Sequence, residues 1–282
     1  MPTRAWILFV LLADSAAGQR ILVYSEFQRI RPDGQVATAD RTSPVHEFIS
    51  PAIPRGGTIT IRLGVESPQG QSYTIFVGQN PDDTAQCKLY QERYVQAGQE
   101  WLPDGLTPVS LPHSAVLTGG QAVQSYLMDI RVPATLKPQR FRLELQLNVG
   151  ERWVIYPLEV RVRDTIVRGE PELVSNPVRP EQRSDAALLI PLMGFACGKT
   201  WKKGDGKLGR ASDIITRNVM SDLLLAQERA KVETREGVVA MIVKAAGSPS
   251  REAFCAGPPP SPSSPEWWLK VRHYLYQGLP VR

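Results

Sequence analysis

The residues of this sequence that could do chemistry begin with its three cysteines, Cys87, Cys197 and Cys255. Cys197 and Cys255 both fall in the part of the chain with helical patterning, so a bridge between them would tie the beginning of that part to its end. An exported chain is expected to oxidise at least one pair. We therefore predict a Cys197–Cys255 disulfide, which would stabilise the fold by about 4 kcal/mol through loop-closure entropy. Cys87 lies in a strand-like run and is predicted to be a small buried hydrophobe.

Groups for catalysis or metal binding are sparse. The histidines His46, His113 and His273 are far apart and have no metal-ligand spacing, and the sequence contains neither a Gly-x-Ser-x-Gly elbow nor a His-Glu-x-x-His pair. Ser114 follows His113, but neighbouring residues on a strand point to opposite faces. The sequence thus predicts no catalytic, metal or cofactor site. A hydrolase assembled from distant carboxylates stays open as an alternative.

A glycine- and lysine-rich stretch invites a phosphate-binding interpretation. Between Gly194 and Gly198 only three residues stand, whereas a nucleotide-binding loop needs four, and no strand leads into it. The basic residues that follow are interleaved with glycines, and only Trp201 could stack on a base. We interpret them as a solvated loop and expect no nucleic-acid partner. These residues are Lys199, Lys202, Lys203, Lys207 and Arg210.

The formal net charge of +5 arises from 33 basic and 28 acidic residues, most of them placed singly among strands. We interpret this charge as a solvated surface rather than as the footprint of an anionic partner.

The first residues are typical of an export signal. Arg4 precedes an uninterrupted apolar run, Ala5 to Ala13, which is too short to cross a bilayer, and small residues follow it. We predict a signal peptide at 1–18, cleaved after Ala17 or Gly18, and a periplasmic or secreted mature protein. An uncleaved anchor or a buried first strand is the alternative. Further on, the longest apolar stretch is interrupted by Pro191.

From about Arg20 to Asp164 apolar and polar residues alternate with the period of a half-buried strand. The pattern is clearest in Arg140 to Val149 and in Val154 to Val162, and the Gly150-Glu151 pair between them suits a type II′ hairpin turn. Pro157 predicts an edge position for the second of these strands, because proline cannot donate to a ladder. Shorter strand patterns lie at Ile21 to Phe27, Ile59 to Val65, Tyr73 to Val77, Cys87 to Gln91 and Tyr126 to Val132.

About seven strands separated by turn sequences, such as Pro103-Asp104-Gly105, predict a two-sheet antiparallel β-sandwich. The stretch from Tyr126 to Ala134, the pair Lys137-Pro138 and the run from Phe141 resemble the closing strands of immunoglobulin-like accessory domains in bacterial exported proteins. This resemblance covers less than a fifth of the chain and implies a fold but no site.

After a proline-containing linker at 165–183, the period changes to that of helices. Ser184 and Ser212 are the expected caps of two helices, and a third runs from Val238 to Ala246. A Pro/Ser-rich loop at 257–265 leads to a last helix capped by Ser264 and stopped by Gly278. Its expected inner stripe is Trp267, Val271, Tyr274 and Leu275.

The last helix also carries the basic residues Lys270, Arg272 and His273, and its basic face is expected to point outward. We expect it to dock on the helical part, and a helix lying on anionic lipid is the alternative. The two cysteines and the helix pattern resemble small disulfide-bridged immunity proteins of bacterial periplasms.

The sequence as a whole predicts a signal peptide (1–18), a β-sandwich domain (20–164), a linker (165–183) and a helical domain (184–282). We expect a non-enzymatic exported protein that binds a protein or glycan partner. A glycan-directed envelope hydrolase and an inhibitor or immunity protein acting through the helical domain are the alternatives.

Overall fold

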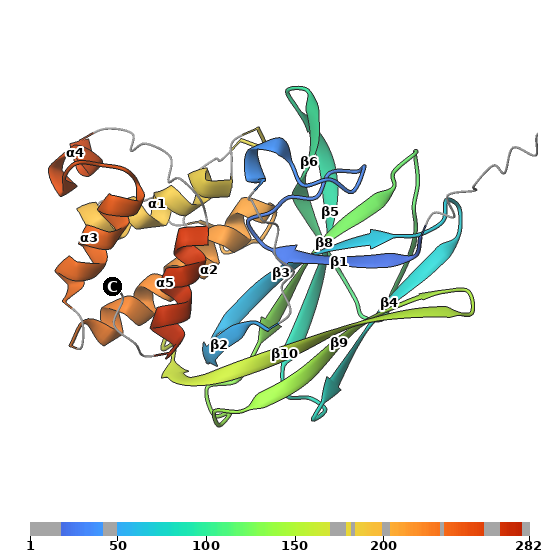
Figure 1. Cartoon of the computed structure of the whole chain (residues 1–282), viewed down its shortest axis with the longest axis horizontal. Coiled ribbons are helices and arrows are strands. Elements are labelled where there is room, and N and C mark those ends of the chain that lie inside the picture. The colour runs from blue at the N-terminus through green and yellow to red at the C-terminus, as the bar shows by residue number, and fades with distance from the viewer. Residues whose placement is uncertain are drawn as a thin grey trace, which may run out of the picture.

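The computed structural model describes residues 18–41, 50–169, 179–181, 184–198, 204–231, 234–256 and 266–277. Two five-stranded β-sheets pack face to face, and five α-helices gather on one side of them (Figure 1). The expected β-rich fold with a helical part is therefore confirmed.

The first sheet, sheet I, is antiparallel throughout and has the strand order β1-β3-β8-β5-β6. Its strands are β1 (Arg20–Ser25), β3 (Thr58–Glu66), β8 (Val123–Arg131), β5 (Gln86–Ala97) and β6 (Glu100–Val109).

The second sheet, sheet II, has the order β2-β10-β9-β4-β7, and its one parallel pair joins β2 to β10. Its strands are β2 (Ala52–Arg55), β10 (Arg152–Ile166), β9 (Arg140–Val149), β4 (Ser72–Asn80) and β7 (His113–Val116).

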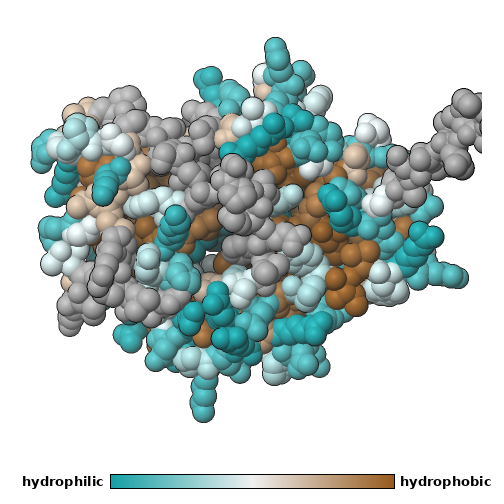
Figure 2. Space-filling model, in the orientation of Figure 1, coloured by the Kyte–Doolittle hydropathy of each residue, from teal (hydrophilic) through white to brown (hydrophobic). Residues whose placement is uncertain are grey.

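Alternation along the strands builds the core between the two sheets. In β9 the apolar residues from Phe141 to Val149 are buried, while the polar residues between them are half-buried or exposed. Hydrophobic residues are visible between β1 and β10, and the surrounding surface is mostly hydrophilic (Figure 2). Val149 opposes Arg152 across Gly150, which has φ +59°, so the hairpin predicted from Gly150-Glu151 is confirmed.

Three strands, β2, β6 and β7, were not predicted from the sequence. Pro103-Asp104-Gly105, expected to form a turn, lies inside β6. Gly105 opposes Arg93 and Pro103 opposes Tyr94, so Asp104 is the extra residue of a β-bulge. A bulge and a turn share the same residue preferences, which explains the wrong prediction.

The edge position predicted for the strand with Pro157 is wrong for the strand as a whole, because β2 lies outside β10 in the sheet. Pro157 itself, however, has a paired strand on one side only. The pairing of β2 with β10 begins only at Arg161, so at Pro157 the strand β10 is paired with β9 alone. The missing N–H of proline therefore costs no ladder bond there. β10 continues to Ile166, two residues into the predicted linker.

The helices are α1 (Ser184–Cys197), α2 (Ala211–Glu228), α3 (Arg235–Ala245), α4 (Arg251–Ala256) and α5 (Glu266–Gln277). Short 3₁₀ turns lie at Thr38–Asp40 and Arg229–Lys231. Buried residues of the helices form one hydrophobic cluster, which also takes in Phe27 and Val167 from the β-rich part. No helix in the described ranges is long and apolar enough to cross a membrane.

The Cys197–Cys255 disulfide is confirmed: it joins the end of α1 to α4 with the two Cα atoms 5.6 Å apart. Cys87 is the free cysteine of the described chain; it is half-buried and packs against the core between the sheets.

Two details of the helical part were wrongly predicted. Ser212 lies inside α2; the cap position is Arg210, because the Asp213 carboxylate accepts the backbone N–H groups of Gly209 and Arg210. In α5 the buried aromatic residues facing α2 are Trp268 and Tyr276, and Tyr274 is exposed, because the Trp268 indole N–H and the Tyr276 hydroxyl donate to a buried carboxylate of α2.

Several sequence expectations fall on residues outside the described ranges. They concern the signal peptide, apart from Gly18, as well as His46, the basic residues Lys199, Lys202 and Lys203, the cap at Ser264 and the stop at Gly278. They stay predictions, as does the division into two domains with a linker.

The disulfide should carry a measurable share of stability. It closes a loop with a sequence separation of 58, so replacing both cysteines by serine should lower the free energy of unfolding by up to about 4 kcal/mol. Urea unfolding measures the change. The control is Cys87→Ala, which should cost only about 1 kcal/mol, since it removes one sulfur from a half-buried site. Equal losses in the two variants would contradict the assignment.

Candidate functional site

The outer face of sheet I, which points away from the core between the sheets, carries rows of polar residues. Arg131 of β8 stands between Thr58 of β3 and Gln86 of β5. In the next row, Asp129 stands between Thr60 and Lys88. Because residues two apart share a face of the sheet, the alternation of β3, β8 and β5 fixes both rows on the same surface.

Helix α2 lies against this face and pairs with it through Arg217. The Arg217 guanidinium donates to both carboxylate oxygens of Asp129, at 2.7 and 2.8 Å, and Thr60 Oγ1 donates to Asp129 at 2.6 Å. The side chains of Arg217 and Asp129 are only 17% and 5% exposed. Burial opposes the charge of Arg217, but the carboxylate outweighs it and raises the pKa of the guanidinium.

A second buried cluster joins α5 to α2 and to the turn after β1. Arg272 donates to Asp222 of α2 and to Glu26, each at 2.8 Å, and the Trp268 indole and the Tyr276 hydroxyl also donate to Asp222. Burial raises the pKa of Asp222 although the Arg272 cation opposes the shift. The expected basic outer face of the last helix is therefore wrong for Arg272, which is buried and paired.

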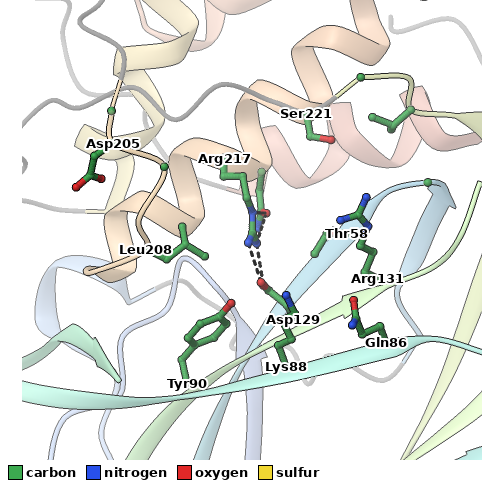
Figure 3. Close-up of a pocket in the computed structure, with 16 residues that line it drawn as sticks. Thr58, Gln86, Lys88, Tyr90, Asp129, Arg131, Asp205, Leu208, Arg217 and Ser221 are labelled. Carbon is green, nitrogen blue, oxygen red and sulfur yellow. Dashed lines mark hydrogen bonds and ion pairs between the residues drawn. The ribbon is translucent and has the colours of Figure 1, made fainter. Parts of the chain in front are cut away.

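Beside α2 the described residues leave the polar rows uncovered, and a cleft of about 690 Å³ lies there (Figure 3). Its walls come from the strands β3, β8 and β5, from α2, and from the two loops around residues 167–169 and 204–208. Lys88, Arg131 and Gln86 are exposed on the strand side, and Arg217 and Asp129 form a paired wall. The remaining lining residues are Gly56, Thr58, Tyr90, Val167, Gly169, Gly204, Asp205, Gly206, Leu208, Asn218 and Ser221.

The charges of the cleft favour an anion. Lys88, Arg131 and Arg217 supply three cations, whereas Asp129 and Asp205 supply two anions. Both oxygens of Asp129 accept hydrogen bonds from neighbouring side chains, and Asp205 Oδ1 accepts the backbone N–H of Lys207 at 3.0 Å. Each carboxylate therefore has a structural role, which disfavours acid–base catalysis by this pair.

The polar groups singled out in the sequence are not brought together. His113 lies on β7, at one edge of sheet II, and its pKa is lowered by burial. His273 lies on α5, which packs at the opposite edge, and burial with the nearby Arg161 and Arg163 lowers its pKa. Ser114 turns away from His113 and shares a hydrogen bond with Thr74 at 2.9 Å. In the described part of the chain no three His, Cys, Asp or Glu residues are grouped to hold a metal ion.

The sequence did not single out Lys88, Asp129 or Arg217. A signal existed in the run from Tyr126 to Val132, where Asp129 and Arg131 fill the positions between core residues. A pattern of this kind shows that these side chains share a face. It does not show whether that face meets water or a helix.

Comparisons with known proteins find structural similarity that is weak in the examples given below. No protein-family model and no curated protein matches the sequence. Among solved structures, a family 123 glycoside hydrolase from Clostridium perfringens is similar at 10% identity with a TM-score of 0.40, covering 55% of this chain and 29% of that one. A DUF4466 family protein from Parabacteroides merdae is also 10% identical, with a TM-score of 0.29. The match covers 55% of this chain and 56% of that one.

The N-terminal domain of PorA is 9% identical, with a TM-score of 0.25 over 51% of this chain and 97% of that one. Similarities this weak carry no argument about function. The resemblance to immunoglobulin-like accessory domains accordingly stays a prediction.

Loss of the Arg217 side chain should lower the stability of the folded protein. Arg217→Ala leaves the Asp129 carboxylate buried without its counter-charge, which should lower the free energy of unfolding by about 3 kcal/mol or more. The matched control is Arg210→Ala, which breaks the more exposed Arg210–Asp104 pair (33% and 15% exposed) between α2 and β6 and should cost about 1 kcal/mol or less. Chemical denaturation of both variants checks this. A loss no larger for Arg217→Ala than for Arg210→Ala would mean that the buried pair does not hold the helix.

Proposed function

We propose that this chain is an exported, non-enzymatic binding protein that holds a small anionic molecule in the cleft between sheet I and α2. The observation that carries the proposal is the placement of Lys88. Its exposed side chain belongs to the cleft, where it lies on β5 as a diagonal neighbour of Arg131 on β8. The long side chains of two diagonal neighbours can reach the same group. Two such cations suit a carboxylate or phosphate group, which offers several acceptor oxygens.

The depth and lining of the cleft support a small ligand. A volume of about 690 Å³ lies within the range of ordinary small-molecule sites. Around the cations the hydroxyl groups of Thr58, Tyr90 and Ser221 can donate to or accept from the rest of the molecule. Gly204 and Gly206 let the backbone approach a ligand closely, since they have no side chain.

Binding explains the lining better than catalysis does. Asp129 is already engaged by Arg217 and Thr60, so using it as a proton donor or acceptor would break the contact that holds α2. The envelope hydrolase and the immunity-type inhibitor stay as the alternatives expected from the sequence, and no contact at the cleft favours either. Export is supported by the disulfide, because such bonds persist in oxidising compartments.

Replacing Lys88 tests the proposal. The wild-type protein is screened by thermal shift against a panel of small anions, namely inorganic phosphate, citrate, glucose 6-phosphate and glucuronate, and hits are measured by calorimetry. Lys88→Ala should raise the Kd at least about tenfold, because a charge-assisted hydrogen bond is worth about 1.5–3 kcal/mol. Lys137→Ala, which removes an exposed lysine outside the cleft, should leave the Kd unchanged.

The proposal is wrong if none of the anions binds. It is also wrong if Lys88→Ala and Lys137→Ala bind a hit equally well.

A further inference from the structure

The outer face of sheet II carries an exposed aromatic patch far from the cleft in the fold. Trp153 and Ile155 of β10 are 53% and 51% exposed. Phe76 of β4 reaches toward Trp153 across the strand between them, so that the two ring centroids are 5.2 Å apart with an angle of 41° between their planes. Large exposed apolar groups gathered in this way are typical of a binding surface.

The strand register surrounds these rings with uncharged residues. Asn148 of β9 stands between Trp153 and Thr74, and Gln146 stands between Ile155 and Phe76. The ionic side chains of this face begin further along the sheet and pair with one another, Arg142 with Glu144 at 2.8 Å and Arg140 with Glu159 at 3.1 Å. A charged ligand over the rings would find no counter-ion in the two rows, so the charge pattern favours a neutral one.

The two amides are held in place with their oxygens left to accept. Asn148 Nδ2 donates to the backbone oxygens of Gly150 and Arg152, at 3.0 and 3.2 Å, and Gln146 Nε2 donates to Glu144 at 3.0 Å. None of the described residues donates to either amide oxygen. A ligand hydroxyl can therefore donate to these oxygens beside the aromatic rings.

The size of the patch suits a sugar ring rather than a protein. Residues two apart along a strand are about 7 Å apart, and β4 and β10 are two strand spacings, or about 10 Å, apart. A stable protein interface covers about 800 Å² of each partner, many times this area. A pyranose offers what fits here, an apolar C–H face to lie on an aromatic ring and a rim of hydroxyl groups to meet amides.

We infer that the face formed by Trp153, Ile155 and Phe76, with Gln146 and Asn148, is a second binding site, which takes neutral carbohydrate. The sugar lies with its C–H face on the Trp153 indole and donates hydroxyl groups to the two amide oxygens. This site is independent of the anion cleft and lies on the other sheet.

Affinity gel electrophoresis tests the site with soluble neutral polysaccharides in the gel: laminarin, xylan, galactomannan and hydroxyethyl cellulose. At least one should retard the protein. Trp153→Ala should abolish the retardation or raise the apparent Kd roughly tenfold or more, as loss of a central aromatic contact does. The chain offers a matched control in Trp101→Ala, since Trp101 is 52% exposed but lies on β6 of sheet I; this variant should be retarded like the wild type.

Three outcomes overturn the inference. They are retardation by none of the neutral polysaccharides, equal retardation of Trp153→Ala and the wild type, and retardation only by an acidic polysaccharide such as polygalacturonate. Size-exclusion chromatography of the same samples adds a fourth: a dimer that becomes a monomer in Trp153→Ala would assign the face to a second copy of the chain. Because Lys88→Ala should leave the retardation unchanged, a failure here is distinguishable from a failure of the anion cleft.

Discussion

The position of the helices depends on the buried charges that sheet I carries on its outer face. Arg62 and Glu92 are fully buried and satisfy each other, with the guanidinium donating to both carboxylate oxygens at 3.0 Å. Asp129 on this face and Glu26 in the turn after β1 have no cationic partner within the sheet. Burying a lone carboxylate costs several kcal/mol, so the cations that neutralise them must come from elsewhere. Arg217 of α2 and Arg272 of α5 supply them, and these two contacts fix where both helices lie.

The cleft follows from the same constraint. Helix α2 is held on the sheet by the ion pair of Arg217 with Asp129. Its first residues Ala211 and Ile214 pack on Leu127 and Tyr90 of the sheet. Among the described residues, the parts of these two rows that α2 does not cover stay open, and they contain Lys88 and Arg131. The ion pair that binds the helix is thus also one wall of the cleft, which explains why a paired and structural carboxylate stands in the middle of a polar site.

Sequence patterns predicted the strands whose polar residues face water and whose apolar residues face the core. The hairpin of β9 and β10 was predictable because one face meets the core and the other meets water. Strand β8 shows the same alternation, yet its polar face is covered by α2, and a period-two pattern cannot distinguish water from a helix bearing the right counter-charge. For the same reason Arg272 was assigned to a solvated face and Tyr274 to the core of the helical part. The disulfide was predictable from the placement of the three cysteines, because Cys197 and Cys255 both fall in the part of the chain with helical patterning.

The two sheets differ in whether the polar residues of their outer faces need a partner from another element. Asp129 of sheet I and Glu26 of the turn after β1 are acidic and need an opposite charge once helices exclude water from them. On sheet II the amides Asn148 and Gln146 are neutral, and their N–H groups already donate to neighbouring residues of the β9–β10 hairpin, so no counter-charge is required there. Exposing the uncharged side chains of Trp153 and Ile155 beside them to solvent has no electrostatic cost and only a modest hydrophobic free-energy cost. Sheet I has therefore become the base for α2, whereas the part of sheet II around Trp153 and Ile155 is exposed among the described residues.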